Sequence, residues 1–154
     1  MKLRRDLKIS VSGVRGIVGE SLTPALAAAF TAAFGQYVGS GKVIVGRDTR
    51  PSGIMIEHAV IASLIAVGCQ PVLAGVVPTP TVQMLVDKYQ ANGGIIITAS
   101  HNPAEWNAMK FVGPSGTFLN YNEAAALLDI YNQTDIAFVN EQEYRKAKIL
   151  KNPF

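Results

Sequence analysis

Cysteine and long apolar runs are both scarce in this sequence. Its 154 residues include a single cysteine, Cys69, which excludes an internal disulfide and favours a buried thiol in a reducing compartment. No apolar run reaches the roughly 18 residues of a membrane-spanning helix. The basic start of the chain is not followed by the apolar segment of a signal peptide. These absences argue against a membrane protein and a disulfide-rich secreted domain, and we expect a cytoplasmic location.

Basic side chains are scarce outside the two ends of the chain. Eight of the fourteen lysines and arginines lie in residues 1–8 and 145–151, together with one acid. Residues 9–144 hold six basic and ten acidic side chains, so the body of the chain is mildly acidic. A nucleic-acid-binding protein gathers its basic residues on a folded face. The sequence therefore predicts neither a nucleic-acid partner nor a membrane partner.

Strand-like and helix-like segments alternate along the chain, which is typical of a layered α/β fold. Apolar residues make up 49% of the sequence, and the length suits one packed domain. We expect strands at residues 8–12, 42–45, 71–73 and 94–98. Helices are expected after the capping side chains of Thr23, Ser52 and Asn122, and a further helix is expected to open at Thr79.

A fifth expected strand, Ala108–Val112, follows the fourth too closely to be parallel to it. Nine residues separate Thr98 from Ala108, whereas a parallel crossover needs about a dozen or more. We therefore expect an antiparallel strand within a mainly parallel sheet, in a three-layer α/β/α sandwich. Ser100 then lies on a wide hairpin loop, and Lys110 lies on the returning arm.

The chain divides into two parts of different composition. Residues 1–140 are expected to form the α/β/α domain. Residues 141–154 are polar and basic, and we expect them to be a linker toward a second domain.

Polar residues follow each strand that we expect to be parallel. Arg15, between two glycines, follows the first strand, and Arg47 and Asp48 follow the second. Pro78 and Thr79 follow the third strand, and Ser100 follows the fourth. Ligands of open α/β sheets bind beyond the carboxyl ends of the strands. We therefore expect these loops to meet at one edge of the sheet.

The string TASHNPAEWNAMKF at Thr98–Phe111 resembles the phosphoserine loop of the α-D-phosphohexomutases. That superfamily includes the phosphoglucomutases, phosphomannomutases and phosphoglucosamine mutases. Three further segments are similar to its other signatures, in the family's order and at about its spacing. They are SVSGVRGIVG at Ser10–Gly19, VGRDTRPSG at Val45–Gly53 and PTPT at Pro78–Thr81.

The resemblance implies a phosphoryl carrier at Ser100. In the family this serine is phosphorylated in the resting enzyme, gives its phosphoryl group to a sugar monophosphate, and takes one back from the bisphosphate intermediate. The resemblance also implies that Lys110 acts as general acid/base for the sugar hydroxyl. Arg15 would bind phosphate through its guanidinium, and His101 and Asn102 would contact substrate or support the loop.

Structural interpretations of the same residues stay open. Residues 100–103 also form an ordinary Ser-His-Asn-Pro turn, Arg15 would suit a surface loop, and Lys110 would suit an exposed edge strand. Arg47, Asp48 and Arg50 are typical of an ion-pair brace behind the Ser100 loop, and we place no direct catalysis there.

An Asp-x-Asp-x-Asp cluster is absent from the sequence. Members of the resembling family hold Mg²⁺ with such a cluster in their next domain, together with the phosphoserine. Mg²⁺ prefers octahedral oxygen ligands, and Ser100 would supply one of them through its phosphate. We therefore expect Mg²⁺ in the full-length enzyme, with its remaining ligands outside this chain and weak or no binding to the chain alone.

The sequence thus predicts the first domain of a phosphohexomutase, an isomerase of sugar 1- and 6-phosphates that is inactive as this chain alone. Glucose, mannose and glucosamine phosphates all remain possible, and the N-terminal stretch favours glucosamine. One alternative is a non-catalytic sugar-phosphate-binding or regulatory domain, because Ala108 and Val11 replace the family's usual glycine and threonine. Another is a self-contained serine phosphatase or esterase, although no Gly-x-Ser-x-Gly motif surrounds Ser100.

Overall fold

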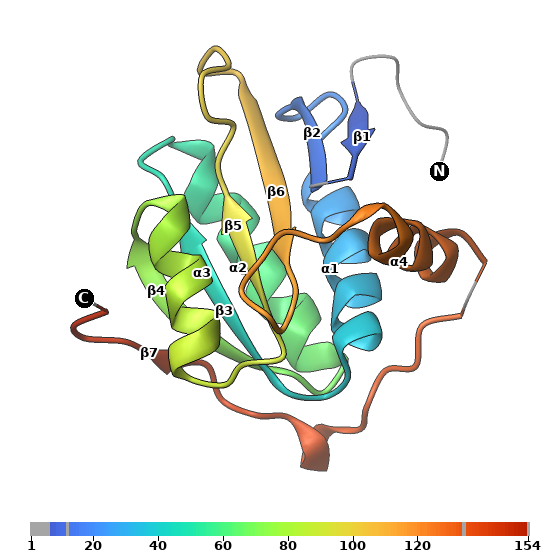
Figure 1. The fold of residues 1–154 in the computed structure, drawn as a ribbon. Coiled ribbons are helices and arrows are strands. Elements are labelled where there is room, and N and C mark those ends of the chain that lie inside the picture. Colours follow the sequence, from blue (N-terminus) through green and yellow to red (C-terminus); the bar gives the residue numbers. More distant parts are fainter. Residues whose placement is uncertain (1–6, 12, 134, 154) are drawn as a thin grey trace.

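Seven strands form one sheet in the computed structural model, which describes residues 7–11, 13–133 and 135–153. Their order across the sheet is β1-β2-β6-β5-β3-β4-β7 (Figure 1). The strands are β1 (Lys8–Ser10), β2 (Gly13–Ile17), β3 (Lys42–Arg47), β4 (Gln70–Val76), β5 (Gly93–Ile97), β6 (Trp106–Val112) and β7 (Lys148–Ile149).

The sheet is mixed, and most of its strands run in one direction. β3 pairs in parallel with β4 and β5, and β4 pairs in parallel with β7. β6 is antiparallel to both β5 and β2, and β1 is antiparallel to β2. The expected antiparallel strand at Ala108–Val112 is therefore confirmed, with its start at Trp106. β1 runs in this direction too, so the expectation that the first strand is parallel to the others is wrong.

Helices cover both faces of the sheet and give the three expected layers. They are α1 (Pro24–Val38), α2 (Ser52–Ala66), α3 (Thr79–Lys88) and α4 (Tyr121–Gln133), followed by a 3-10 turn at Glu141–Glu143. In Figure 1, α3 lies in front of the sheet, and α1 and α2 lie behind it. α4 packs beside α1 in the same core cluster. The α/β/α sandwich is confirmed.

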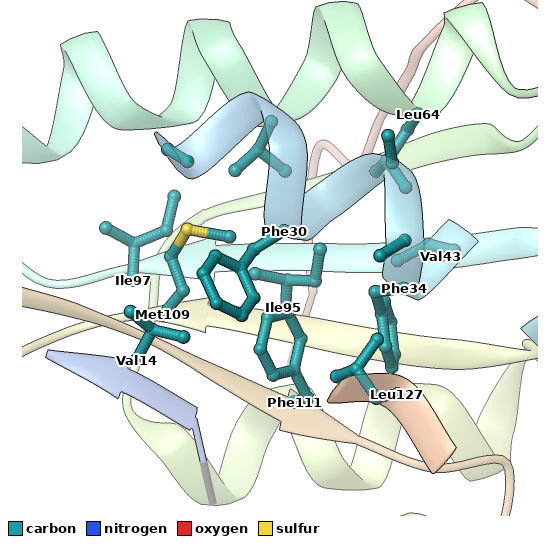
Figure 2. Packing of buried hydrophobic residues seen from close by; sticks show 14 of the residues in the cluster. Val14, Phe30, Phe34, Val43, Leu64, Ile95, Ile97, Met109, Phe111 and Leu127 are labelled. Atoms are coloured by element: carbon teal, nitrogen blue, oxygen red, sulfur yellow. The ribbon is translucent and has the colours of Figure 1, made fainter. Parts of the chain in front are cut away.

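The larger core lies between α1 and the sheet. Phe30 and Phe34 of α1 point toward the strands in Figure 2, and the rings of Phe34 and Phe111 are 4.8 Å apart. Ile95 and Met109 complete this layer from β5 and β6 and are fully buried. Burying side chains of this size is worth about 1.5–3 kcal/mol each, so this layer fixes how β6 sits in the sheet.

The first helix begins as the sequence predicts. Thr23 Oγ1 accepts a hydrogen bond from the Leu26 backbone N–H at 3.2 Å, and Pro24 is the first helical residue. Ser52 was expected to cap α2, and this expectation is wrong. It is the first residue of the helix, and its Oγ accepts a hydrogen bond from Asn107 Nδ2 at 2.8 Å.

The cap of α4 lies two residues before the expected one. Asn120 Oδ1 accepts a hydrogen bond from the Glu123 backbone N–H at 2.9 Å, and Glu123 Oε1 accepts one from the Asn120 N–H at 3.2 Å. This reciprocal pair is a capping box. Asn122 lies inside the first turn of the helix, so the expectation that it is the cap is wrong.

The glycine-arginine segment after the first strand is itself a strand, and not the loop that we expected. β1 ends at Ser10, and β2 turns back against it from Gly13 to Ile17. A Cβ at Gly13 would collide with the carbonyl oxygen of Met109. Only glycine therefore lets β2 approach β6 this closely at that position.

The segment that we expected to be a linker contributes to the edge of the sheet. Lys148–Ile149 forms β7, which pairs with β4, and the Leu150 N–H donates to the Leu73 carbonyl at 2.9 Å. Its role as a linker toward a second domain stays a prediction. Among the described helices, none is long and apolar enough to span a bilayer.

Candidate active site

Ser100 lies in the loop between β5 and β6, which projects beyond the end of the sheet in Figure 1. The residue is exposed and has a φ of 55°. Residues other than glycine seldom adopt this left-handed conformation, because it costs about 1–2 kcal/mol. Strained backbone of this kind clusters at functional sites, and here the surrounding hydrogen bonds hold it.

Lys110 reaches Ser100 from the returning strand. Its Nζ donates a hydrogen bond to Ser100 Oγ at 2.9 Å. Lys110 is held in β6 opposite Ile96 of β5 on one side and Gly13 of β2 on the other. The wide hairpin that the sequence predicts therefore exists, and it brings these two side chains together.

Arg50 holds the Ser100 loop from behind. Its Nη2 donates to the carbonyls of Ser100 at 3.1 Å and Asn102 at 2.7 Å. Its Nη1 donates to the carbonyls of Pro103 at 2.7 Å and Trp106 at 3.0 Å. Four carbonyls of one loop are thus held by one planar guanidinium, a geometry that lysine cannot reproduce.

Asp48 and Thr98 hold the other side of Ser100. Asp48 Oδ2 accepts a hydrogen bond from Thr98 Oγ1 at 2.8 Å, and Thr98 Oγ1 accepts one from the Ser100 N–H at 3.2 Å. Asp48 also lies 3.3 Å from Arg50 Nε and accepts the Arg50 N–H at 3.0 Å. Both backbone groups of Ser100 are therefore fixed.

Arg15 faces the same loop from β2. Its Nη1 donates to Asn102 Oδ1 at 3.2 Å, and its guanidinium carbon lies 5.7 Å from the centre of the Trp106 ring. Asn102 also closes its own turn through an N–H bond to the Ala99 carbonyl at 3.1 Å. Arg15, Asn102 and Ser100 are thus gathered around one loop, as the sequence predicts.

Three expected positions lie apart from this group. His101 is exposed, and Arg47 is directed toward α2, with its Nε 3.6 Å from Glu57 and its Nη1 on the Asp48 carbonyl at 3.3 Å. Pro78–Thr81 opens α3 and packs at the adjoining strand end. None of these positions is among the described residues that line the two cavities containing Ser100, one bordered by Arg15 and Lys110 and the other by Asp48 and Arg50.

A cavity of about 220 Å³ opens beside Ser100 and is lined by residues of β1, β2, β6 and the Ser100 loop. Its charged lining residues are Lys8, Arg15 and Lys110, and none of the described lining residues is acidic. Lys8 and Thr98 were not among the site residues predicted from the sequence, whereas Arg50 was predicted in the brace behind the Ser100 loop, where the structure has it. Thr98 begins the recognised string, whereas Lys8 sits in a basic terminal stretch that gives no signal of a site.

No group of three potential metal ligands occurs among the described residues. The carboxylate of Asp48, beside the loop, is engaged by Arg50 and Thr98. The donor set around Ser100 is cationic and does not fit a Mg²⁺ cage. Binding of Mg²⁺ through a phosphate on Ser100 stays a prediction.

The clearest pKa shifts lie away from this site. Burial raises the pKa of the Cys69 thiol, which is fully buried as the sequence predicts. Burial likewise raises the pKa of Tyr131, and burial followed by the charge of Glu123 raises that of Tyr37. The two tyrosines lie on α1 and α4, Cys69 lies in the turn before β4, and none of the three lines the cavity beside Ser100.

Residues 6–137 match the family model for the phosphoglucomutase/phosphomannomutase alpha/beta/alpha domain I. The chain belongs to this family. A phosphoglucomutase/phosphomannomutase of Thermococcus kodakarensis is 40% identical over 147 residues, which cover 90% of this chain and 32% of that relative. A phosphoglucosamine mutase of Clostridium kluyveri is 45% identical over 109 residues, covering 68% of this chain and 24% of the relative.

Solved structures of the phosphoglucomutase/phosphomannomutase family share the fold. One assigned to the phosphomannomutases, from Thermus thermophilus, has a TM-score of 0.79 and 28% identity, covering 94% of this chain and 33% of the other. A family protein of Burkholderia thailandensis has a TM-score of 0.73 at 23% identity, covering 96% and 32%. The chain spans a third or less of the relatives that it matches.

Proposed function

We propose that this chain is the phosphoryl-carrying domain of a phosphohexomutase that interconverts a sugar 1-phosphate and a sugar 6-phosphate. Ser100 carries the phosphoryl group, gives it to the sugar monophosphate, and recovers one from the other oxygen of the bisphosphate intermediate. The observation that carries the proposal is the 2.9 Å hydrogen bond from Lys110 Nζ to Ser100 Oγ, in a cationic cavity of a chain of this family.

Proton balance supports a shared role for Lys110. When the bond from phosphorus to Ser100 Oγ breaks and the bond to the sugar oxygen forms, the sugar hydroxyl loses a proton and the serine oxygen gains one. Lys110, whose Nζ donates to Oγ, would deliver a proton to that oxygen as its bond to phosphorus breaks, and would take up the proton that the sugar hydroxyl loses. Arg15 would offset the charge of the transferring group.

The hydrogen bonds from Arg50 and Thr98 to the Ser100 backbone explain how the Ser100 side chain would stay oriented during transfer. Phosphoryl transfer depends on alignment and charge neutralisation more than on covalent chemistry. Arg50 holds the carbonyl of Ser100, and Thr98 holds its N–H. With its backbone fixed in this way, Ser100 keeps its Oγ within hydrogen-bonding distance of Lys110 Nζ. This arrangement suits a phosphoryl carrier.

The other parts of the enzyme would lie outside this chain. The chain spans 32% and 24% of two mutase relatives, so turnover is assigned to the full-length polypeptide and the chain alone is expected to be inactive. When bound, Mg²⁺ would add positive charge at the phosphoryl group, held by the phosphate on Ser100 and by ligands from outside this chain. The sugar would be glucose, mannose or glucosamine phosphate.

The test combines phosphate mapping with activity. In the full-length polypeptide that carries this sequence, mass spectrometry of the Ser100 peptide is expected to show phosphorylation. Ser100→Ala should abolish interconversion of 1- and 6-phosphosugars, whereas Ser115→Ala, an exposed serine in the turn after β6, should leave it intact. Undiminished turnover in Ser100→Ala would refute the proposal, and phosphosugar hydrolysis by the chain alone would favour a phosphatase.

A further inference from the structure

We propose that Trp106 is a positioning residue for the transfer reaction, because its indole ring holds the Arg15 guanidinium beside the Ser100 loop. The guanidinium carbon of Arg15 lies 5.7 Å from the centre of that ring. The task given to Arg15, to offset the charge of a transferring phosphoryl group, rests on the proposed function. The contact between the two side chains does not rest on it and is tested separately.

Strand register makes the two side chains neighbours. Arg15 of β2 is opposite Ala108 of β6, and Trp106 is two residues from Ala108 on the same strand. Residues two apart along a strand point to the same face, and diagonal partners on antiparallel strands lie within reach of aromatic and long side chains. The Trp106 ring therefore offers the guanidinium a flat surface, which the methyl group of Ala108 does not.

The backbone of Trp106 is fixed at the start of β6. Its carbonyl accepts a hydrogen bond from Arg50 Nη1 at 3.0 Å, and its N–H donates one to the Pro103 carbonyl at 3.0 Å. The side chain is half-buried, at the point where the Ser100 loop enters the strand. A guanidinium that packs on this ring is thus placed relative to the loop that carries Ser100.

The partners of Arg15 orient its guanidinium and leave its charge in place. Arg50, behind the loop, forms an ion pair with Asp48 at 3.3 Å. Arg15 has no carboxylate within ion-pairing distance among the described residues. It donates to the Asn102 amide oxygen at 3.2 Å and lies over the aromatic ring. Both partners are neutral groups that attract a cation through partial charges, so the full positive charge of Arg15 stays available to a phosphoryl group.

An exposed arginine needs such contacts to keep one position. Arg15 is exposed, and a free arginine side chain gains about 1.5–2 kcal/mol from its rotamer freedom. A single hydrogen bond to Asn102 fixes one nitrogen of the guanidinium, and the ring fixes the plane of the group. Without the ring, the charge of Arg15 would spend less time beside Ser100.

The NMR signal of the Arg15 Nε–H group tests the contact in the 154-residue chain. The ring current of an indole moves the signals of protons above its face upfield. Trp106→Leu should return the Arg15 signal to the position of an ordinary arginine and lower its order parameter. Trp106→Phe keeps an aromatic face, so it should retain the upfield shift and the order. An Arg15 signal that is the same in wild type and Trp106→Leu would overturn the inference.

Turnover of the full-length polypeptide tests the consequence for the reaction. Trp106→Leu should lower kcat about threefold and leave KM near the wild-type value, because the charge of Arg15 is needed mainly in the transition state. Trp106→Phe should restore most of kcat. Tyr89→Leu is the matched control, since it removes a ring that lies 5.6 Å from Lys88 Nζ at the end of α3, and its kcat should equal that of the wild type.

A double-mutant cycle shows whether Trp106 acts through Arg15. Arg15→Met removes the charge and should lower kcat more than Trp106→Leu does. In the Arg15→Met background, Trp106→Leu should have no further effect on kcat. A general disturbance of the loop would lower kcat by the same factor in both backgrounds, and that result would overturn the inference. Thermal unfolding of each variant checks that the fold is intact.

The two readouts separate this inference from the proposed function. If Ser100 carries phosphate and Trp106→Leu leaves both the Arg15 signal and kcat unchanged, the role of Trp106 fails and the proposed function stands. If Trp106→Leu releases Arg15 in the NMR experiment and Ser100 is never phosphorylated, the proposed function fails and the positioning of Arg15 by Trp106 stands.

Discussion

Arg50 and Ser100 are fifty positions apart in the chain, and a hydrogen bond of 3.1 Å joins the Arg50 guanidinium to the Ser100 carbonyl. The same guanidinium holds three more carbonyls of the loop. The shape of the loop that carries Ser100 therefore depends on a planar donor from the turn between β3 and α2.

Replacing Arg50 with lysine should slow phosphosugar interconversion in the full-length polypeptide. A lysine keeps the charge and loses the fork that contacts four carbonyls, so Ser100 would shift relative to Lys110. Misplacement of a reacting group by about 1 Å can cost about 100-fold, and we expect a roughly 10- to 100-fold lower kcat. Arg145→Lys, which alters an arginine bound to the Ser40 carbonyl, is the control. A wild-type kcat in Arg50→Lys would contradict the claim that the Arg50 guanidinium positions the Ser100 loop.

Thr98→Val should destabilise the chain, and Thr98→Ser should not. Valine keeps the shape of threonine and removes the hydroxyl that links Asp48 to the Ser100 N–H. Leaving such partners unpaired costs about 1–3 kcal/mol. Urea unfolding of the 154-residue chain measures the difference. Similar stabilities for the valine and serine variants would show that the hydroxyl does not hold the loop.

The backbone conformation of Ser100 predicts a difference between two substitutions. Its φ of 55° is free of strain for glycine and strained for alanine. Ser100→Gly should therefore be more stable than Ser100→Ala by about 1 kcal/mol, although both lose the hydroxyl that Lys110 contacts. Denaturant unfolding of the two variants in parallel gives the value. Equal stability would mean that Ser100 is relaxed.

Asn120 and Asn122 give a direct test of where α4 begins. Asn120 forms the capping box with Glu123, whereas Asn122 is exposed within the first turn. Asn120→Ala should cost about 1 kcal/mol of unfolding free energy, and Asn122→Ala should cost little. A larger loss of unfolding free energy for Asn122→Ala than for Asn120→Ala would show that Asn122 is the cap, as expected from the sequence.

Alkaline pH should weaken the fold through Cys69. Burial raises the pKa of its thiol, so the unfolded chain loses this proton at lower pH than the folded chain does. The contribution of Cys69 to stability is thus complete below the unfolded pKa of about 8.5 and is lost as pH rises through the folded value. Between about pH 8 and pH 9.5, below the range of the tyrosines, Cys69→Ala should flatten the fall in unfolding free energy. An unchanged slope would contradict this.

Much of the fold follows from local signals, and the pairing of the first strands does not. Nine residues between two apolar runs suffice to predict the β5–β6 hairpin, and thus the approach of Lys110 to Ser100. The segment Gly13–Ile17 has no comparable signal, because glycine at a close approach of two strands and glycine in a loop look alike in sequence. Arg15 was therefore predicted in a loop, and it lies on a strand.

The two arginines beside Asp48 show another limit. Arg47 and Arg50 flank the same acid and follow the same strand, yet only Arg50 reaches the carbonyls of the Ser100 loop. Arg47 is the last residue of β3 and turns toward Glu57, while the turn after Asp48 directs Arg50 the other way. That choice depends on tertiary placement of the turn, which side-chain type does not encode.

Because Lys8, Arg15 and Lys110 lie on strands, the sheet face that each side chain occupies depends on whether the number of residues before it in the strand is odd or even. One residue inserted between Gly13 and Arg15 would turn the guanidinium into the apolar layer beneath α1, and two would return it to the cavity one pleat further along. Length changes in β1 or β2 are thus tolerated in pairs. A loop of the same composition would obey no such rule.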